Sequence, residues 1–355
     1  MAAKRSDLAE GVKTHDGNAA WKSPLDRRRD ALARAIVDVA RDRTRVVPPP
    51  GTLVRVPPTD RTASPTPDER PERLNALIAA LDAAFLERGP HVRMSLLALL
   101  AGHHVLLIGP PGTAKSLLAR SLCDAMADAE YFEYLLSRFT HPDELFGPVS
   151  IPGLKQEDYR RLTEGYLPAA GVAFLDEVFK ANSAILNSLL TLINERIFHH
   201  GRHRDRVPLI GLIGASNELP QDDSLTALYD RFLVRLSVPP LAQRDAFLSV
   251  ATGSIEPARI PPDLRLGADE REAYRTLASQ VAVPERVQDA LAVLWRAARD
   301  NEWDISDRRW RHAVDLLKMA AATAGRAHVQ TLDLLLLETV LAPHPSEQLA
   351  VRDLL

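Results

Sequence analysis

The pattern of hydrophobic and polar positions divides the chain into an alternating part and a helical part. Between residues 71 and 240, short apolar runs typical of buried strands alternate with segments of helical period. The five expected strands lie at 105–108, 131–136, 172–177, 209–215 and 232–238. From residue 241 onward only the helical period recurs. We therefore expect an α/β domain at 71–240, with a parallel five-stranded sheet and helices on both faces, followed by an all-helical domain at 241–355.

Residues 1–70 follow neither pattern. They carry a net charge of +4, which leaves −7 for the remainder of a chain whose total is −3, and their prolines crowd between 48 and 67. Such a composition cannot bury much apolar surface, so it predicts an extended or disordered N-terminal extension. Within it, Ser23-Pro24-Leu25-Asp26 has the residue types of a helix start, and we expect a short amphipathic helix over 23–43.

Composition narrows the classes of protein that remain. The 355 residues contain one cysteine, Cys123, which excludes an internal disulfide and any cysteine cluster for zinc. No apolar run reaches the roughly 18–20 residues of a membrane span, and the first residues lack the apolar core of a secretory signal. A net charge of −3 gives no general argument for binding nucleic acid. These features predict a cytoplasmic protein.

The candidate chemistry begins at the end of the first expected strand. There a turn rich in glycine and proline leads into a helix, as in a phosphate-binding P-loop. The loop consists of Gly109, Pro110, Pro111, Gly112, Thr113, Ala114, Lys115 and Ser116. The backbone N–H groups of Gly112 through Ser116 can converge on a phosphate, with the lysine at the β- and γ-phosphates and the serine hydroxyl on Mg²⁺. Ala114 departs from the strict pattern, which has a second glycine at that position.

Two acids close the third expected strand. Four apolar residues, 172–175, are followed by Asp176 and Glu177. On a strand of the same sheet as a P-loop, this is the Walker B arrangement, in which the aspartate holds Mg²⁺ and the glutamate takes a proton from the attacking water. Together the two motifs predict an Mg²⁺-dependent nucleoside triphosphatase.

Three further polar residues are candidates for the same site. Asn217 follows the fourth strand and could hold the attacking water, or it could cap the turn before Glu218. Arg231 could be an arginine finger that stabilises transition-state charge, or it could pair with Asp230. Of Arg308 and Arg309, which begin a helix in the second domain, we expect one to reach the phosphates and the other to remain solvated.

At this point a specific resemblance emerges. The segments GPPGTAKS, ELFGPVSIPGLK, TEGYLP, FLDEVFKAN, LLTLINERIF, GASNELP, ALYDRF and SDRRW occur in this order. Together they resemble the MoxR family of AAA+ ATPases, with the regulatory ATPase variant (RavA) subgroup as the most similar branch. The resemblance covers about residues 71–345. Members of the family carry alanine before the P-loop lysine, so Ala114 fits it.

The resemblance implies the following assignments. The ligands are ATP and Mg²⁺, the latter held by Ser116 and Asp176. Segment 140–168 is an insertion, and 196–208 is a hairpin. Sensor 1 is Asn217, sensor 2 is Arg308, and Arg231 is an arginine finger that acts on a neighbouring subunit. Family members form hexameric rings and act as chaperone-like machines, many with a von Willebrand factor A-domain (vWA) protein that binds a metal ion.

Two other functions remain open from the sequence. The first is a nucleic-acid motor, which the acidic net charge outside the extension disfavours. The second is an ATP-gated scaffold with slow turnover. The hairpin is rich in histidine and arginine, and we expect either a solvated hairpin or a basic collar around the pore of a ring, rather than a metal site.

Overall fold

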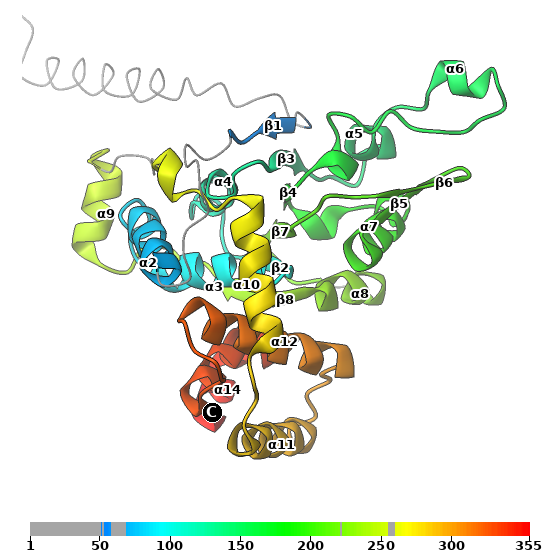
Figure 1. The fold of residues 1–355 in the computed structure, drawn as a ribbon. Helices are drawn as coiled ribbons and strands as arrows, with labels where there is room; N and C mark the ends of the chain where they lie inside the picture. Colours follow the sequence, from blue (N-terminus) through cyan, green and yellow to red (C-terminus); the bar gives the residue numbers. More distant parts are fainter. Residues whose placement is uncertain (1–50, 52, 58–68, 221, 255–259) are drawn as a thin grey trace, which may run out of the picture. The chain divides into compact units, whose positions relative to one another are not determined.

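The computed structural model describes residues 51, 53–57, 69–220, 222–254 and 260–355 (Figure 1). The helix expected over 23–43 lies outside these residues. By its internal contacts the chain forms two units, Met1–Val47 and Pro48–Leu355, and the description below concerns the second.

A six-stranded sheet lies at the centre of this unit, in the order β1-β3-β4-β7-β2-β8. Its strands are β1 (Leu53–Arg55), β2 (His104–Ile108), β3 (Glu130–Leu135), β4 (Val172–Asp176), β7 (Gly211–Ser216) and β8 (Phe232–Ser237). Every pair from β3 to β8 is parallel, which confirms the predicted five-stranded parallel sheet. The strands are apolar along most of their length because both faces are covered.

The edge strand β1 differs from the prediction for the N-terminal extension. Instead of an extended, solvated segment, Leu53–Arg55 pair antiparallel with β3, and the Val56 N–H continues the pairing to the carbonyl of Ala129 at 2.9 Å. A three-residue strand has no stability alone and forms only where β3 offers its free edge. The prolines of this region flank the strand, as expected because they cannot donate to a ladder.

Val56 anchors this edge strand in the core. Its side chain is 5% exposed and belongs to the large apolar cluster, whereas that of Val54 is 39% exposed. We expect Val56→Ala to lower the free energy of unfolding by about 1–3 kcal/mol, measured by urea denaturation. Val54→Ala is the matched control and should change it by less than about 0.5 kcal/mol. Equal effects of the two substitutions would contradict this packing of β1.

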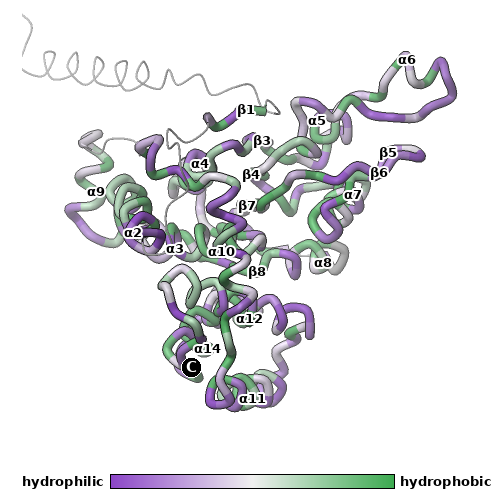
Figure 2. The backbone as a smooth tube through the Cα atoms, in the orientation of Figure 1, coloured by the Kyte–Doolittle hydropathy of each residue, from purple (hydrophilic) through white to green (hydrophobic). Residues whose placement is uncertain are grey.

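Helices cover both faces of the sheet, and in β2 and β4 successive side chains alternate between two apolar clusters. Leu107 and Phe174 belong to the cluster on one face, and Leu106 and Leu175 to the cluster on the other. The helices of this α/β part are α2 (Glu69–Asp82), α3 (Gly89–Leu100), α4 (Lys115–Asp124), α7 (Ser183–Glu195) and α8 (Asp223–Arg231). In Figure 2 green, hydrophobic stretches run through α2, α3 and the sheet.

Two segments stand out from the sheet. The segment 140–168 contains the short helices α5 (Pro142–Phe146) and α6 (Ile151–Leu154) and the 3₁₀ turn η1 (Leu167–Ala169), and α6 projects away from the sheet (Figure 1). The strands β5 (Ile197–His200) and β6 (His203–Arg206) form an antiparallel hairpin beside it. The two segments contact each other, since His203 Nε2 lies 2.8 Å from Asp158 Oδ1.

From residue 241 the described residues form helices and turns, and no strand beyond isolated bridges at Leu266, Ala282 and His328, which confirms the all-helical lid. They are α9 (Arg244–Ala251), η3 (Pro262–Leu264), α10 (Ala268–Gln280), α11 (Glu285–Asp300), α12 (Asp307–Thr323), η4 (Thr331–Leu337), α13 (Glu338–Leu341), η5 (Pro345–Glu347) and α14 (Gln348–Leu354). The buried Tyr274 of α10 donates its hydroxyl to the carbonyl of Arg70, at 2.9 Å. Within the part of the chain that the structure describes, no helix is long and apolar enough to cross a membrane.

Two histidines near the lid stay neutral in the folded protein. His104 is buried, and its Nδ1 accepts the N–H of Leu212 at 3.0 Å, so this nitrogen cannot carry a proton. The ring of His103 packs 4.6 Å from that of His312 on α12, and its Nε2 is enclosed without a hydrogen-bond partner in the part of the chain that the structure describes. Burial, followed by the neighbouring His312 and Arg196, lowers the pKa of His103 to about 3.

This lowered pKa predicts acid sensitivity. The unfolded chain protonates His103 near pH 6.5 and the folded chain only near pH 3, so stability is complete above about pH 6.5 and falls with pH below it. We expect this histidine to contribute as much as about 1.4 kcal/mol per pH unit to the decrease between pH 6 and 5. Urea midpoints at each pH measure the slope. His103→Gln should flatten it, and His199→Gln, at an exposed position of the hairpin, should not.

Candidate active site

The P-loop lies at the carboxyl ends of the parallel strands, directly after β2, which stands between β7 and the last strand of the sheet, β8. The side of the sheet at which these strands end is called the P-loop edge below. Ile108 ends β2 and is paired with Ser216 at the end of β7 and with Ser237 at the end of β8. The N–H of Gly109 then donates to the carbonyl of Ser216, at 3.1 Å. A Cβ on Gly109 would lie 2.2 Å from the carbonyl oxygen of Val238, so only glycine fits there. This is the edge at which open α/β sheets bind ligands.

Ala114 adopts the backbone conformation that a glycine would adopt more easily. Its φ of 66° is left-handed, and it stands directly before α4, which begins at Lys115. Gly112 also has a positive φ, of 80°. The left-handed conformation costs a non-glycine residue about 1–2 kcal/mol. The loop keeps the turn of a P-loop in spite of this cost, and the N–H groups at the start of α4 remain available to an anion.

Lys115 is buried, and its ammonium group bends back over the loop. Nζ donates to the carbonyls of Gly109 and Pro110, at 2.7 and 2.8 Å, and to Asn217 Oδ1 at 3.2 Å. Burial lowers the pKa of Lys115, while the nearby Asp176 and Glu177 act to raise it. A phosphate in the loop would therefore meet an ammonium group that is already placed beside it.

Asp176 and Glu177 follow at the end of β4. Asp176 Oδ1 accepts the N–H of Glu177 at 2.9 Å, and burial raises the pKa of Asp176. Glu177 has a φ of 52°, an uncommon conformation for this residue type that often occurs at functional sites. The two carboxylate oxygens of Glu177 are each held by one donor: Oε1 by Asn217 Nδ2 at 2.6 Å and Oε2 by Lys180 Nζ at 3.2 Å.

Asn217 thus joins the P-loop to Glu177. Its Oδ1 accepts from Lys115, and its Nδ2 donates to Glu177. The turn that follows is held by the preceding residue, because Ser216 Oγ accepts the N–H of Glu218 at 3.2 Å and donates to its carbonyl at 2.6 Å. The geometry favours contact with the site over the alternative in which Asn217 caps the turn.

The arginines lie on the opposite side of the sheet from the P-loop edge, where the parallel strands β2 and β8 begin. Arg231 directly precedes Phe232, which begins β8 and is paired with His104 at the start of β2. Because β8 has six residues, this edge is roughly 16–20 Å from the P-loop edge. Arg231 Nη1 lies 3.3 Å from Asp230 Oδ2, which is the ion pair considered from the sequence, but the side chain remains 23% exposed. The structure therefore does not bring Arg231 to the P-loop of its own chain.

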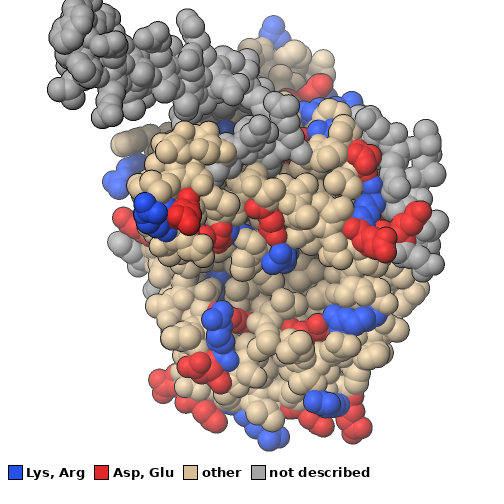
Figure 3. Space-filling view, turned by 90° about the vertical axis from the view of Figure 1, so that its left-hand side faces the viewer, with Lys and Arg blue, Asp and Glu red and all other residues tan. Residues whose placement is uncertain are grey.

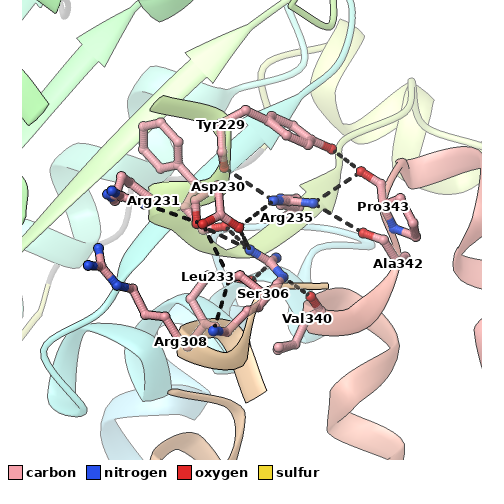
Figure 4. Close-up of polar contacts among 12 residues, drawn as sticks. Tyr229, Asp230, Arg231, Leu233, Arg235, Ser306, Arg308, Val340, Ala342 and Pro343 are labelled. Carbon is pink, nitrogen blue, oxygen red and sulfur yellow. Dashed lines mark hydrogen bonds and ion pairs between the residues drawn. The ribbon is translucent and has the colours of Figure 1, made fainter. Parts of the chain in front are cut away.

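Arg308 and Arg309 have different environments. Arg308 is exposed and donates to Asn194 Oδ1 at 3.2 Å. Figure 4 shows its guanidinium on the same side of the contact between core and lid as that of Arg231. Arg309 is buried and donates to the carbonyls of Val340 and Leu233, at 2.6 and 2.7 Å, and burial lowers its pKa to about 9. The expectation that the second arginine is solvated is wrong, since Arg309 joins α12 to β8.

The donors at the P-loop edge fit the expected ligands. A hydroxyl from Ser116 and a carboxylate from Asp176 are the hard oxygen donors that Mg²⁺ prefers. The loop supplies backbone N–H groups, the positive end of α4 and the Lys115 ammonium to a polyphosphate. The sequence reasoning did not single out Lys180, although its position one turn after Glu177 is the spacing at which such ion pairs form.

Comparison with known proteins agrees with this fold, that of an AAA+ core and its lid. A family described as the MoxR domain in the MoxR–vWA–beta-propeller ternary systems matches residues 72–255, and an AAA lid domain matches residues 286–355. The chain therefore belongs to the MoxR family of AAA+ ATPases, a membership that supports ATPase activity in general.

Individual relatives cover different parts of the chain. The protein MJ0079 of Methanocaldococcus jannaschii is 40% identical over 269 residues, which are 76% of this chain and 70% of the relative. The protein MoxR of Paracoccus denitrificans is 29% identical over 176 residues, 47% of this chain and 50% of the relative. A crystal structure from Cytophaga hutchinsonii superposes with a TM-score of 0.63 at 16% identity, over 78% of this chain and 87% of that one, and shows the shared fold.

Proposed function

We propose that the protein is an Mg²⁺-dependent ATPase that works as a ring, in which the arginines of one subunit complete the active site of the next. The observation that carries this proposal is the separation of the site residues. The P-loop, Asp176, Glu177 and Asn217 share one edge of the sheet, whereas Arg231 and Arg308 share the other. A head-to-tail arrangement of subunits brings two such unlike edges together, and it forms a ring when the rotation between neighbouring subunits closes.

Each residue at the P-loop edge has a chemical role in this proposal. The backbone N–H groups of 112–116 and the Lys115 ammonium bind the β- and γ-phosphates, while Ser116 and Asp176 hold Mg²⁺. Bound Mg²⁺ supplies shielding of the phosphate charge. Glu177 accepts a proton from the attacking water, and Asn217 orients that water. The contacts of Asn217 with both Lys115 and Glu177 support its place next to the reacting groups.

The arginines act on the nucleotide of a neighbouring subunit. Among the described residues Arg231 has one ion-pair contact, at 3.3 Å, and its Nε is enclosed without a hydrogen-bond partner. Arg308 is exposed beside it. A guanidinium brought to the γ-phosphate stabilises the charge of the transition state. In this proposal both Arg231 as the arginine finger and Arg308 as sensor 2 act in trans.

We further propose that the cycle remodels a partner protein with a vWA domain, in the cytoplasm. The matching family is described from ternary systems with vWA and beta-propeller proteins, which supports this partner class. Exposed apolar side chains on α6, Ile151 and Leu154, lie on a segment that could contact a protein. The hexameric ring and the narrower placement in the RavA subgroup remain predictions.

Nucleic acid is the less favoured substrate. On the face shown in Figure 3, acidic and basic side chains are interspersed among uncharged ones. A nucleic-acid motor would need a basic path along the phosphate backbone.

The decisive experiment measures ATP hydrolysis, with Mg²⁺, as a function of protein concentration and of an added vWA partner. A ring that remodels this partner should show a rate per subunit that rises with assembly, which mass photometry detects, and rises again with the partner. A rate that is independent of assembly would overturn the completion of the site in trans. A rate that responds to DNA and not to the vWA protein would overturn the partner class.

A further inference from the structure

The carboxylate of Asp230 lies between three arginines, and Asp230 directly precedes the proposed arginine finger, Arg231. Its Oδ2 is 3.3 Å from Arg231 Nη1, and its Oδ1 is 3.7 Å from Arg309 Nη1 and 4.0 Å from Arg235 Nη2. The Oγ of Ser306, at the start of the lid helix α12, donates to Oδ2 at 3.5 Å. Figure 4 shows these groups converging on the carboxylate. Asp230 therefore contacts the core strand β8, the lid and Arg231 at once.

The two buried arginines cross the boundary between core and lid in opposite directions. Arg309 of the lid donates to carbonyls at the start of β8, those of Phe232 and Leu233, at 3.2 and 2.7 Å. Arg235 of β8 donates to lid carbonyls, those of Ala342 and Pro343, at 3.3 and 3.1 Å. Burial lowers the pKa of both arginines, and Asp230 acts to raise it. The carboxylate thus offsets buried positive charge on both sides of the boundary.

Tyr229, the residue before Asp230, contacts both the lid and the turn that follows Glu177. The Arg235 guanidinium lies 3.7 Å above the ring of Tyr229, whose hydroxyl donates to the carbonyl of Pro343 at 2.7 Å. The ring of Phe179 lies 6.0 Å from the Tyr229 ring. Phe179 belongs to η2 (Val178–Lys180), which begins directly after Glu177. The segment 229–231 is therefore held between the lid and η2.

We propose that Asp230 is a positioning residue for Arg231, through which the lid of one subunit sets the placement of the guanidinium that enters the next active site. This inference rests on the proposed function of Arg231. The contact of Asp230 with Arg231 is a single ion pair on a partly exposed side chain, whereas Arg309 and Arg235 are fixed by several carbonyls. The carboxylate orients Arg231 without enclosing it, which leaves the guanidinium able to contact a phosphate.

The test uses Asp230→Asn in the full chain. The amide keeps the shape of the side chain and removes its charge, and the carbonyl contacts of Arg309 remain. Since a misplacement of about 1 Å can cost about 100-fold, we expect kcat to fall about 10- to 100-fold with an unchanged KM for ATP. The matched control is Asp333→Asn, which breaks the lid ion pair with Arg326 at 2.7 Å, and it should keep the kcat of the wild type.

Mixed rings separate positioning from a structural role. Subunits with Asp230→Asn keep an intact P-loop edge, so their defect should lie in the neighbouring site. Diluted into an excess of Glu177→Gln subunits, which carry intact arginines, they should recover the turnover of wild-type subunits diluted in the same way. Thermal unfolding of each variant is measured in parallel. If the asparagine variant does not fold, Asp230→Glu replaces it in the test. This substitution keeps the charge but moves it by one methylene, so it should lower kcat by less and show the same recovery of turnover in mixed rings.

The outcomes also separate this inference from the proposed function. If subunits with Arg231→Ala are not rescued by Glu177→Gln subunits, the action of Arg231 in trans is overturned, and the role of Asp230 with it. If they are rescued, but folded Asp230 variants have wild-type kcat or a loss that dilution does not restore, only the role of Asp230 is overturned. Rescue of both variants supports both.

Discussion

Glu177→Gln is expected to lower the kcat of ATP hydrolysis about 10²- to 10⁴-fold, the usual contribution of a general base, while ATP still binds. An amide cannot accept a proton from water at neutral pH. The glutamine Oε1 can still accept from Asn217 Nδ2, which holds Glu177 at 2.6 Å, so the geometry of the edge should persist. Turnover is measured by phosphate release, and affinity by titration with a fluorescent ATP analogue.

The control for this substitution is Glu157→Gln, at an exposed position in the insertion, which should leave both turnover and affinity unchanged. Near-normal turnover of Glu177→Gln would remove the assignment of Glu177 as the base. A collapse of ATP affinity would instead give Glu177 a role in binding.

Arg231→Ala is expected to lower kcat about 10³- to 10⁵-fold without weakening ATP binding, because an arginine finger acts on the transition state. Arg231 lies at the ends of the strands opposite the P-loop, so in the proposed ring we expect the defect in the neighbouring subunit. Mixing with an excess of Glu177→Gln subunits should therefore restore turnover at the intact P-loops of the Arg231→Ala subunits. Phosphate release per Arg231→Ala subunit is the measurement.

Arg244→Ala offers a matched control, since within the described residues Arg244 pairs with its neighbour Asp245 alone and both side chains are largely exposed. It should keep the wild-type rate. Loss of ATP affinity in Arg231→Ala, or a fall in its thermal midpoint without rescue in mixed rings, would show that Arg231 supports the fold through Asp230 and is not a finger.

The five parallel strands could be predicted because each is a nearly unbroken apolar run. Strand β1 could not. Its three residues lie among prolines, and only the free edge of β3 makes pairing favourable at Leu53 to Arg55. Local sequence thus determines a strand that is buried on both faces, whereas an edge strand depends on the neighbour that it joins.

The candidate site likewise contains residues that local sequence could locate and residues whose placement depends on tertiary packing. Residues consecutive in sequence, such as 109–116 and Asp176-Glu177, carry their own geometry as a strand end and turn, and they could be located without a structure. The difference between Arg308 and Arg309 could not be predicted. It depends on which guanidinium faces the carbonyls of β8, and tertiary packing decides that. The left-handed backbone of Ala114 also opposes the preference of its residue type.

The crossed arginines at the lid boundary have a mechanical consequence. Arg309 of the lid donates to carbonyls of the core, and Arg235 of the core donates to carbonyls of the lid. A rotation of the lid away from the core would therefore break hydrogen bonds to buried carbonyls on both sides at once. We expect the lid and core of a subunit to turn as one lever. In the proposed ring, the movement driven by each hydrolysis would then occur at the interfaces between subunits, as a rotation of whole protomers relative to their neighbours.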